Sequence, residues 1–404
     1  MLKKIFTSFL AAALLLTGCA KKEESGAADS LPEESVVSQP NTSEDENMLS
    51  EKSFPASEQY ARLIGRTAEN EGILWLALSA SGVEFTFTGT SASFTLVGDN
   101  MTENAEKQPR YAVYINGERT MDELLDSAEK NVTVFTSDEP AQATVKLLKL
   151  SEAQESTMGI RSINVTSAED ITPTAQAEDR LKIEFIGDSI TCGYGVDDED
   201  RDHHFKTSTE DATKAYAFKT AMALDADYSL VSYSGNGIIS GYTDNGTRQT
   251  SQLVPAVYKK FAKSWGNYDM FNVQEVDWDF SRFQPDYIVI NLGTNDASYT
   301  KGKQDRVQEY IDGYVDFLTV VRENNPDAHI ICSLGVMGAD LYSAIEKAAA
   351  AYTEKTGDAN LSTFKFSTQD GNKNGYAADW HPTEASQYIA AAELTEYIKS
   401  LIAG

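Results

Sequence analysis

The residues best suited to chemistry in this chain stand in four short polar segments. These segments are Gly187-Asp188-Ser189, Ser234-Gly235-Asn236, Gly293-Thr294-Asn295 and Asp379-Trp380-His381. A serine acts as an acyl-transfer nucleophile when a base lies within hydrogen-bond reach and N–H donors face the developing oxyanion. Of the chain's four histidines, only His381 follows the last expected strand into a loop. The four segments together predict a Ser–His site for acyl transfer.

Each candidate residue receives a role from its chemistry. Ser189 is the predicted nucleophile, and His381 is the predicted general base. The backbone N–H groups of Ser189 and Gly235 and the side-chain amide of Asn295 are the predicted oxyanion donors. Trp380, beside the base, is a candidate for contact with the substrate.

Purely structural roles for these residues stay open as alternatives. Ser189 also suits a helix N-cap, and Asn295 suits a turn. Gly237 competes with Gly235 for the role of oxyanion donor. Asp379 could cap the last helix or orient the base.

The elements that must position these residues alternate between strand and helix after residue 182. Short apolar runs predict strands, and amphipathic stretches between them predict helices such as 308–323, 341–354 and 383–402. This alternation indicates a doubly wound parallel sheet, in which ligands bind beyond the carboxyl ends of the strands. The expected strands are Ile183–Ile186, Tyr228–Tyr233, Tyr287–Leu292, His329–Leu334 and Phe364–Phe366.

The part of the chain before residue 173 contains short runs typical of β-strands. About seven runs rich in β-branched and aromatic residues, separated by turn residues, predict an all-β sandwich. We expect a signal peptide over residues 1–18, a disordered acidic tether over 19–57, the sandwich over 58–172 and the α/β domain over 173–404.

The first residues resemble the signal of bacterial lipoproteins. Lys3 and Lys4 precede an apolar run that is short for a membrane span, and Leu16-Thr17-Gly18-Cys19 is similar to a lipobox. The resemblance implies cleavage before Cys19, a lipid on its sulfur, and a protein anchored to the outer face of the cell membrane. An ordinary signal peptide with an incidental cysteine is the alternative.

Charge and cysteine content exclude several classes of function. The formal net charge of −28 argues against nucleic acid and makes an anionic polymer an unfavourable substrate. Cys192 and Cys332 show no metal-type spacing and are expected to be small buried residues rather than a disulfide. A segment from Asp370 begins like a calcium loop but has His381 at its twelfth position. No metal, no cofactor and a monomer are expected.

The four segments resemble the blocks of the SGNH (GDSL-type) hydrolases, over about residues 180–404. With a β domain in front, the chain resembles carbohydrate esterase family two, in which a jelly roll precedes the SGNH domain. This resemblance implies a three-layer, flavodoxin-like α/β domain and a metal-free Ser–His esterase that removes acetyl groups from plant polysaccharides such as xylan or glucomannan, often at the 6-hydroxyl. Most SGNH enzymes carry an Asp three residues before the His, where this chain has Ala378. Either Asp379 or a backbone carbonyl is therefore expected to orient His381.

The predicted function is thus a carbohydrate O-acetyl esterase, with the acetylated sugar as partner. Two alternatives remain at this point. Another SGNH activity, such as a lipase or thioesterase, would use the same residues. A non-catalytic sugar-binding lipoprotein could keep the fold without turnover.

Overall fold

A computed structural model describes residues 48–177 and 179–403, which belong to one compact unit. The predicted signal peptide, the Cys19 lipidation site and most of the predicted tether lie outside these residues. Within the described ranges, none of the helices combines the length and apolar character that crossing a bilayer requires.

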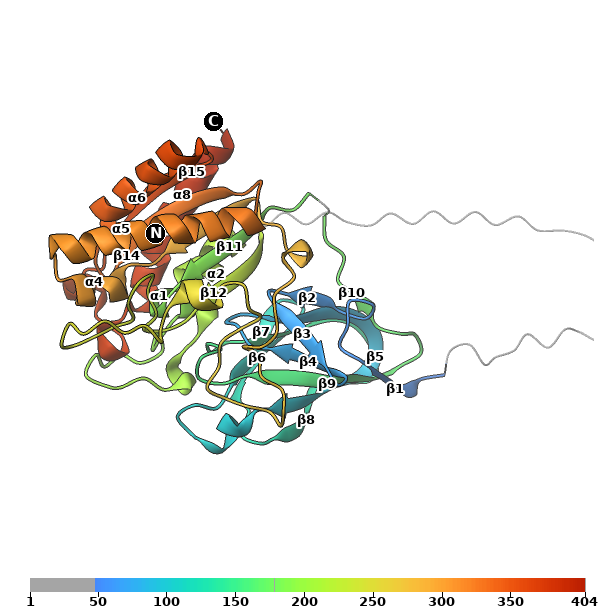
Figure 1. The fold of residues 1–404 in the computed structure, drawn as a ribbon. Helices are drawn as coiled ribbons and strands as arrows, with labels where there is room; N and C mark the ends of the chain where they lie inside the picture. The colour runs from blue at the N-terminus through green and yellow to red at the C-terminus, as the bar shows by residue number, and fades with distance from the viewer. Residues whose placement is uncertain (1–47, 178, 404) are drawn as a thin grey trace, which may run out of the picture. The chain divides into compact units, whose positions relative to one another are not determined.

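The first part is an antiparallel sheet of ten strands, drawn in blue and green in Figure 1. Its main path runs β3-β4-β9-β5-β8-β6-β7. This arrangement confirms the predicted all-β domain. The strands are β1 (Ser50–Phe54), β2 (Arg62–Ile64), β3 (Thr67–Asn70), β4 (Ile73–Leu76), β5 (Gly82–Gly98), β6 (Arg110–Ile115), β7 (Glu118–Leu124), β8 (Glu129–Lys149), β9 (Met158–Ser167) and β10 (Thr172–Pro173).

Two predicted details of this part differ from the structure. Runs expected to be separate strands join into the long strands β5 and β8, because the two pair along most of their length with only local register shifts. The predicted tether also ends too late. Ser50–Phe54 forms β1, which pairs with β9 and buries Phe54.

The second part is a parallel five-stranded sheet in the order β12-β11-β13-β14-β15. All five strands lie where the apolar runs predicted them. They are β11 (Lys182–Gly187), β12 (Asp227–Ser232), β13 (Tyr287–Asn291), β14 (His329–Val336) and β15 (Leu361–Thr368).

Helices cover both faces of this sheet, as the pattern predicted. Side chains alternate along each strand, so Ile186 and Ile290 enter one core with α5 and α6, while Phe185 and Val289 enter another with α2 and α8. The result is the three-layer α/β architecture. The helices are α1 (Ser189–Cys192), α2 (Tyr216–Ala223), α3 (Val254–Val257), α4 (Thr294–Thr300), α5 (Gln304–Asn324), α6 (Tyr342–Thr356), α7 (Gly371–Asn374) and α8 (Glu384–Ala403).

The two parts share a hydrophobic core. Trp75 of β4 packs in the same cluster as Ile186 of β11. Arg66, fully buried, forms a 3.0 Å ion pair with Glu184 of β11. The two parts are therefore held together by buried contacts as well as by the chain. Cys192 and Cys332 are buried and free, as predicted.

Candidate active site

Ser189 begins the short helix α1 directly after β11. The carboxylate of Asp188 accepts the Ile190 N–H at 3.1 Å, which caps this turn as expected for that residue. A Cβ at Gly187 would lie 2.1 Å from Oγ1 and 2.7 Å from Cβ of Thr191, so a side chain there would displace Thr191. The sequence thus presents Ser189 at the carboxyl edge of the sheet, where it lines a cavity of about 490 Å³.

His381 lies within hydrogen-bond distance of this serine. Its Nε2 atom is 2.9 Å from Ser189 Oγ, although 192 positions separate the two residues in the chain. The other ring nitrogen, Nδ1, lies 3.1 Å from the carbonyl oxygen of Ala378 and 3.2 Å from that of Asp379. Carbonyl oxygens only accept, so Nδ1 carries the proton and Nε2 is free to accept one from the serine.

The imidazole is also held from its face. The Tyr194 ring stacks on His381 with centroids 4.0 Å apart. Burial lowers the pKa of His381 from its ordinary value of 6.5 to about 4. The ring is therefore neutral near pH 7, as a general base must be.

Asp379 does not contact His381 through its carboxylate, contrary to one of the two sequence-based alternatives. The carboxylate accepts the Tyr194 hydroxyl at 2.8 Å and the Phe205 N–H at 3.3 Å, and it lies 3.2 Å from Nδ1 of His204. The physical reason is the backbone, which turns left-handed at Asp379 (φ 47°) within the 3₁₀ turn Ala378–Trp380. That turn directs main-chain carbonyls to the histidine and the side chain to Tyr194.

The predicted oxyanion donors gather around the same cavity. Gly235, left-handed at φ +72°, and Asn295, at the start of α4, both line it with Ser189. Within the described residues, the Gly235 N–H donates to no acceptor, whereas the Gly237 N–H donates to Gln252 O at 3.1 Å. Gly235 is therefore the better placed of the two glycines.

Asn295 is fixed by its neighbours. Its Nδ2 donates to Asn236 O at 2.8 Å and to the Asp188 carboxylate at 3.3 Å. Both N–H groups of the amide therefore have acceptors in the protein, and an oxyanion would replace the longer of the two bonds. Asp296, which the sequence reasoning did not single out, accepts the N–H groups of residues 238–240 at 2.8 to 3.0 Å. These contacts tie the loop after β12 to the start of α4.

Aromatic side chains stand at the rim of the cavity. Trp380 is 48% exposed and Tyr242 is 56% exposed, and both line it. Arg201 lies over the Trp380 ring at 4.1 Å. Neither Tyr194 nor Tyr242 stands in the four segments that the sequence analysis singled out.

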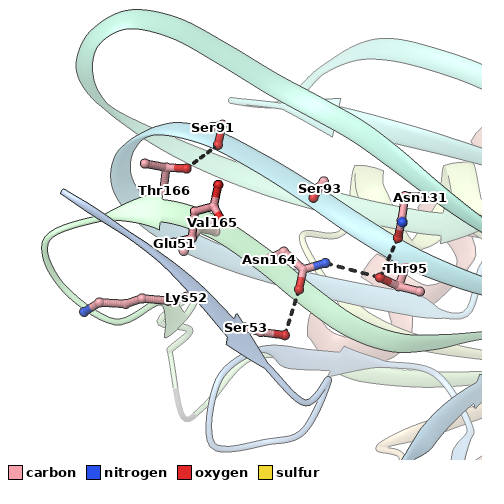
Figure 2. A pocket seen from close by; sticks show the side chains of 10 residues that line it. All are labelled: Glu51, Lys52, Ser53, Ser91, Ser93, Thr95, Asn131, Asn164, Val165 and Thr166. Carbon is pink, nitrogen blue, oxygen red and sulfur yellow. Dashed lines mark hydrogen bonds between the residues drawn. The ribbon is translucent and has the colours of Figure 1, made fainter.

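A second hollow, of about 620 Å³, lies on the β domain between β1, β5, β8 and β9 (Figure 2). Its polar groups largely pair with one another: Asn164 bonds to Ser53 and Thr95, and Ser91 bonds to Thr166. Its lining residues include no aromatic ring for a sugar. This hollow therefore gives no indication of a ligand.

One buried cluster has ligand atoms close enough for a metal ion. The ligand atoms of Glu152, Cys192 and Glu210 lie within 4.8 Å of one another. Burial raises the pKa of the Cys192 thiol well above its usual range, which disfavours the thiolate that binds metals. The buried Lys149 already supplies positive charge to both carboxylates. We assign no metal to this cluster.

Comparisons with known proteins match both parts of the chain. The GDSL-like Lipase/Acylhydrolase family matches residues 185–388, and the Carbohydrate esterase 2 N-terminal family matches residues 63–174. The chain is 29% identical to the cellulase/esterase CelE of Acetivibrio thermocellus, over 80% of this chain but only 37% of that protein's length. It is 27% identical to an acetylxylan esterase / glucomannan deacetylase of Cellvibrio japonicus, over 88% of this chain and 92% of that protein.

A solved structure agrees with these sequence matches. It is an acetyl xylan esterase, Est2A, from the rumen bacterium Butyrivibrio proteoclasticus. The TM-score is 0.77 at 27% identity, covering 88% of this chain and 99% of that chain. The similarity therefore spans both the β sheet and the α/β part described above.

Proposed function

The chain belongs to the GDSL-like lipase/acylhydrolase family, and from that premise we propose that it removes O-acetyl groups from a plant polysaccharide or its oligosaccharides. The observation that carries the proposal is the 2.9 Å contact between Ser189 Oγ and His381 Nε2. It lies in a cavity that also contains Gly235 and Asn295. A nucleophile, a neutral base and oxyanion donors are the parts that ester hydrolysis through an acyl-enzyme needs.

The reaction follows from this geometry. Ser189 Oγ attacks the acetyl carbonyl while His381 Nε2 takes the hydroxyl proton. The Gly235 N–H, the Ser189 N–H and the Asn295 amide stabilise the oxyanion. The histidine returns its proton to the departing sugar oxygen, which leaves Ser189 acetylated. A water molecule then gives a proton to His381 and attacks the acetyl-enzyme. His381 returns that proton to Ser189 Oγ as acetic acid leaves, and the acid ionises to acetate.

Two further observations support a carbohydrate substrate, and a third concerns the charge of that substrate. Similar proteins are an acetylxylan esterase / glucomannan deacetylase and an acetyl xylan esterase. The exposed Trp380 and Tyr242 offer ring faces at the rim of the cavity, and such amphipathic rings suit the faces of pyranose sugars. The net charge of −28 favours a neutral acetylated glycan over a uronate-rich one.

Acetate release tests the substrate class. Wild-type protein is incubated with acetylated xylan, acetylated glucomannan and a series of esters of increasing acyl length, and NMR locates the hydroxyl that loses its acetyl group. We expect the acetylated glycans to be turned over and activity to fall as the acyl chain lengthens. A preference for long acyl chains would instead identify a lipase or thioesterase, and binding without turnover would identify a sugar-binding protein.

We also propose that Cys19 carries a lipid that anchors the protein to the outer face of the cell membrane. The support is the sequence Leu16-Thr17-Gly18-Cys19 after a short apolar run. Labelling of expressing cells with a radioactive fatty acid tests it. The wild type should incorporate label and the Cys19→Ala variant should not, and equal labelling of both would contradict the anchor.

A further inference from the structure

The connection between β8 and β9 in the β domain is buried. All residues from Leu150 to Thr157 are at most 7% exposed. Loops that join strands normally run over the surface. This segment, residues 150–157, instead inserts against the α/β part beside the loop that carries Gly235.

Two side chains of this segment bond to the residues on either side of Gly235. The carboxylate of Glu152 accepts the Ser234 N–H at 2.8 Å. The Gln154 amide donates to Ser234 O at 3.0 Å and accepts from Asn236 Nδ2 at 2.8 Å. Both backbone polar groups of Ser234 and the Nδ2 group of Asn236 are thus held from the β domain.

The same contacts reach the second oxyanion donor. Asn236 O is the acceptor, at 2.8 Å, of the Asn295 amide. Asn236 therefore connects Gln154 to Asn295, because it bonds to both of them. Glu152 and Gln154 belong to the β domain, whereas every residue assigned to the reaction belongs to the α/β part.

The segment is itself held in place. Glu210 of the α/β part accepts the Glu152 N–H at 2.7 Å. Lys149, fully buried, donates to the carbonyl oxygens of Ser151 and Glu152 at 2.6 and 3.0 Å. These contacts hold the backbone N–H and carbonyl oxygen of Glu152 and so limit where its side chain points.

We propose that Glu152 and Gln154 are positioning residues that hold the Gly235 N–H and the Asn295 amide in the geometry of the oxyanion hole. The inference rests on the proposed esterase function. Oxyanion donors are effective because they need no reorganisation during the reaction. Contacts that hold the loop carrying these donors therefore contribute to the rate. The β domain is then part of the catalytic apparatus although none of its residues touches the reacting atoms.

The polar character of the segment supports this role over simple packing. Glu152 is fully buried, and its Oε1 has no hydrogen-bond partner within the described structure. A buried carboxyl oxygen without a partner lowers stability. A segment that served only to join two domains would be more stable with apolar side chains at this position.

The test compares Glu152→Ala and Gln154→Ala with the conservative Glu152→Gln, whose amide oxygen can still accept the Ser234 N–H. We expect kcat per titrated active site to fall about 10- to 100-fold in the alanine variants, because a displaced donor is weakened rather than removed. The KM should stay within about twofold, since ground-state contacts are unchanged. Glu152→Gln should recover kcat to within about threefold of the wild type.

Arg282→Ala is the matched control. Arg282 donates to the carbonyl oxygen and the hydroxyl of Thr67 across the same interface, at 2.7 and 3.1 Å, and does not line the cavity. It should lower the melting temperature without changing kcat. Alanine variants of Glu152 and Gln154 that lower the melting temperature but keep kcat per active site would overturn the proposal, as would a Glu152→Gln variant as slow as Glu152→Ala.

A phosphonate that reacts with activated serines separates this proposal from the proposed function. Its reaction with Ser189 also develops negative charge at the oxyanion hole and needs no acetylated sugar. A wild type that reacts with the phosphonate but does not hydrolyse acetyl esters would contradict the proposed function alone. Equal labelling rates in wild type, Glu152→Ala and Gln154→Ala would contradict the positioning role.

Discussion

The Nδ1 atom of His381 lies 3.1 Å from the carbonyl oxygen of Ala378, which occupies the position where related hydrolases carry an aspartate. A main-chain acceptor thus fixes the tautomer of the base. The Asp379 carboxylate instead bonds to Tyr194, whose ring stacks on the imidazole. We therefore propose that the site works as a Ser–His pair with a backbone orienting group.

Asp379→Asn should retain most activity. The amide oxygen can still accept the Tyr194 hydroxyl, and asparagine tolerates the left-handed backbone at this position. We expect kcat to fall less than about tenfold, far from the roughly 10⁴-fold loss typical of a carboxylate that holds the histidine tautomer. Steady-state kinetics on an acetyl ester measures this. A loss near 10⁴-fold would show that the carboxylate orients the base after all.

Gly195→Ala should impair catalysis through the same backbone. A Cβ at Gly195 would lie 2.6 Å from the Cβ of Ala378, so the turn that orients His381 must shift. We expect kcat to fall about 10- to 100-fold, since a displacement of about 1 Å can have that effect.

Gly357→Ala is the control for that experiment. Gly357 ends α6 with a similar left-handed backbone, but a Cβ there meets nothing within 4 Å. The left-handed backbone alone should lower the stability of each variant by about 1 kcal/mol, measured by urea unfolding. The clash with Ala378 should add to the loss in Gly195→Ala. Only Gly195→Ala should lower kcat, and equal kcat values in the two variants would contradict the assigned role of the Ala378 carbonyl.

The low pKa of His381 predicts activity in mildly acidic solution. Protonation of the base abolishes its function, so kcat/KM should stay constant down to about pH 5 and fall with a midpoint near the pKa of about 4. A midpoint near 6.5 would contradict the burial of the ring. The unfolding free energy must be followed in parallel. Because the unfolded chain binds this proton more tightly, His381 lowers stability as the pH falls from 6.5 toward 4.

Trp380→Ala should weaken sugar binding without affecting the chemistry. We expect the KM for acetylated xylo-oligosaccharides to rise about three- to tenfold, the range of a lost aromatic contact. The kcat/KM for p-nitrophenyl acetate, which lacks the sugar, should stay within about twofold. Trp265→Ala is a suitable control, because Trp265 is 44% exposed but does not line the cavity. Equal KM changes for both substrates would contradict a sugar contact at Trp380.

The strands of the α/β sheet and the polar segments at its edge could be predicted from the sequence. Strands buried on both faces form continuous apolar runs, so β11 and β13 are recognisable as such. Ser189 and Asn295 follow these runs directly, and parallel strands bring their carboxyl ends to one edge. The long pairing of β5 with β8 was less visible, because bulges interrupt its alternation of apolar and polar residues.

The orientation of His381 could not be read from residue types. Any residue supplies a backbone carbonyl, so Ala378 carries no signal of its role. The hydrogen bonds from Glu152 and Gln154 could not be predicted from the sequence either, since 82 positions separate these residues from Ser234 and Asn236. Only the packing of the β domain against the α/β part brings these pairs together.

The central claim is that Ser189, activated by His381, hydrolyses acetyl esters of a glycan. The most direct measurement compares acetate release from acetylated xylan by the wild type and by Ser189→Ala, with circular dichroism to show that both are folded. We predict steady release by the wild type and a loss of at least about 10³-fold in the variant. Equal release by the two proteins would contradict the mechanism.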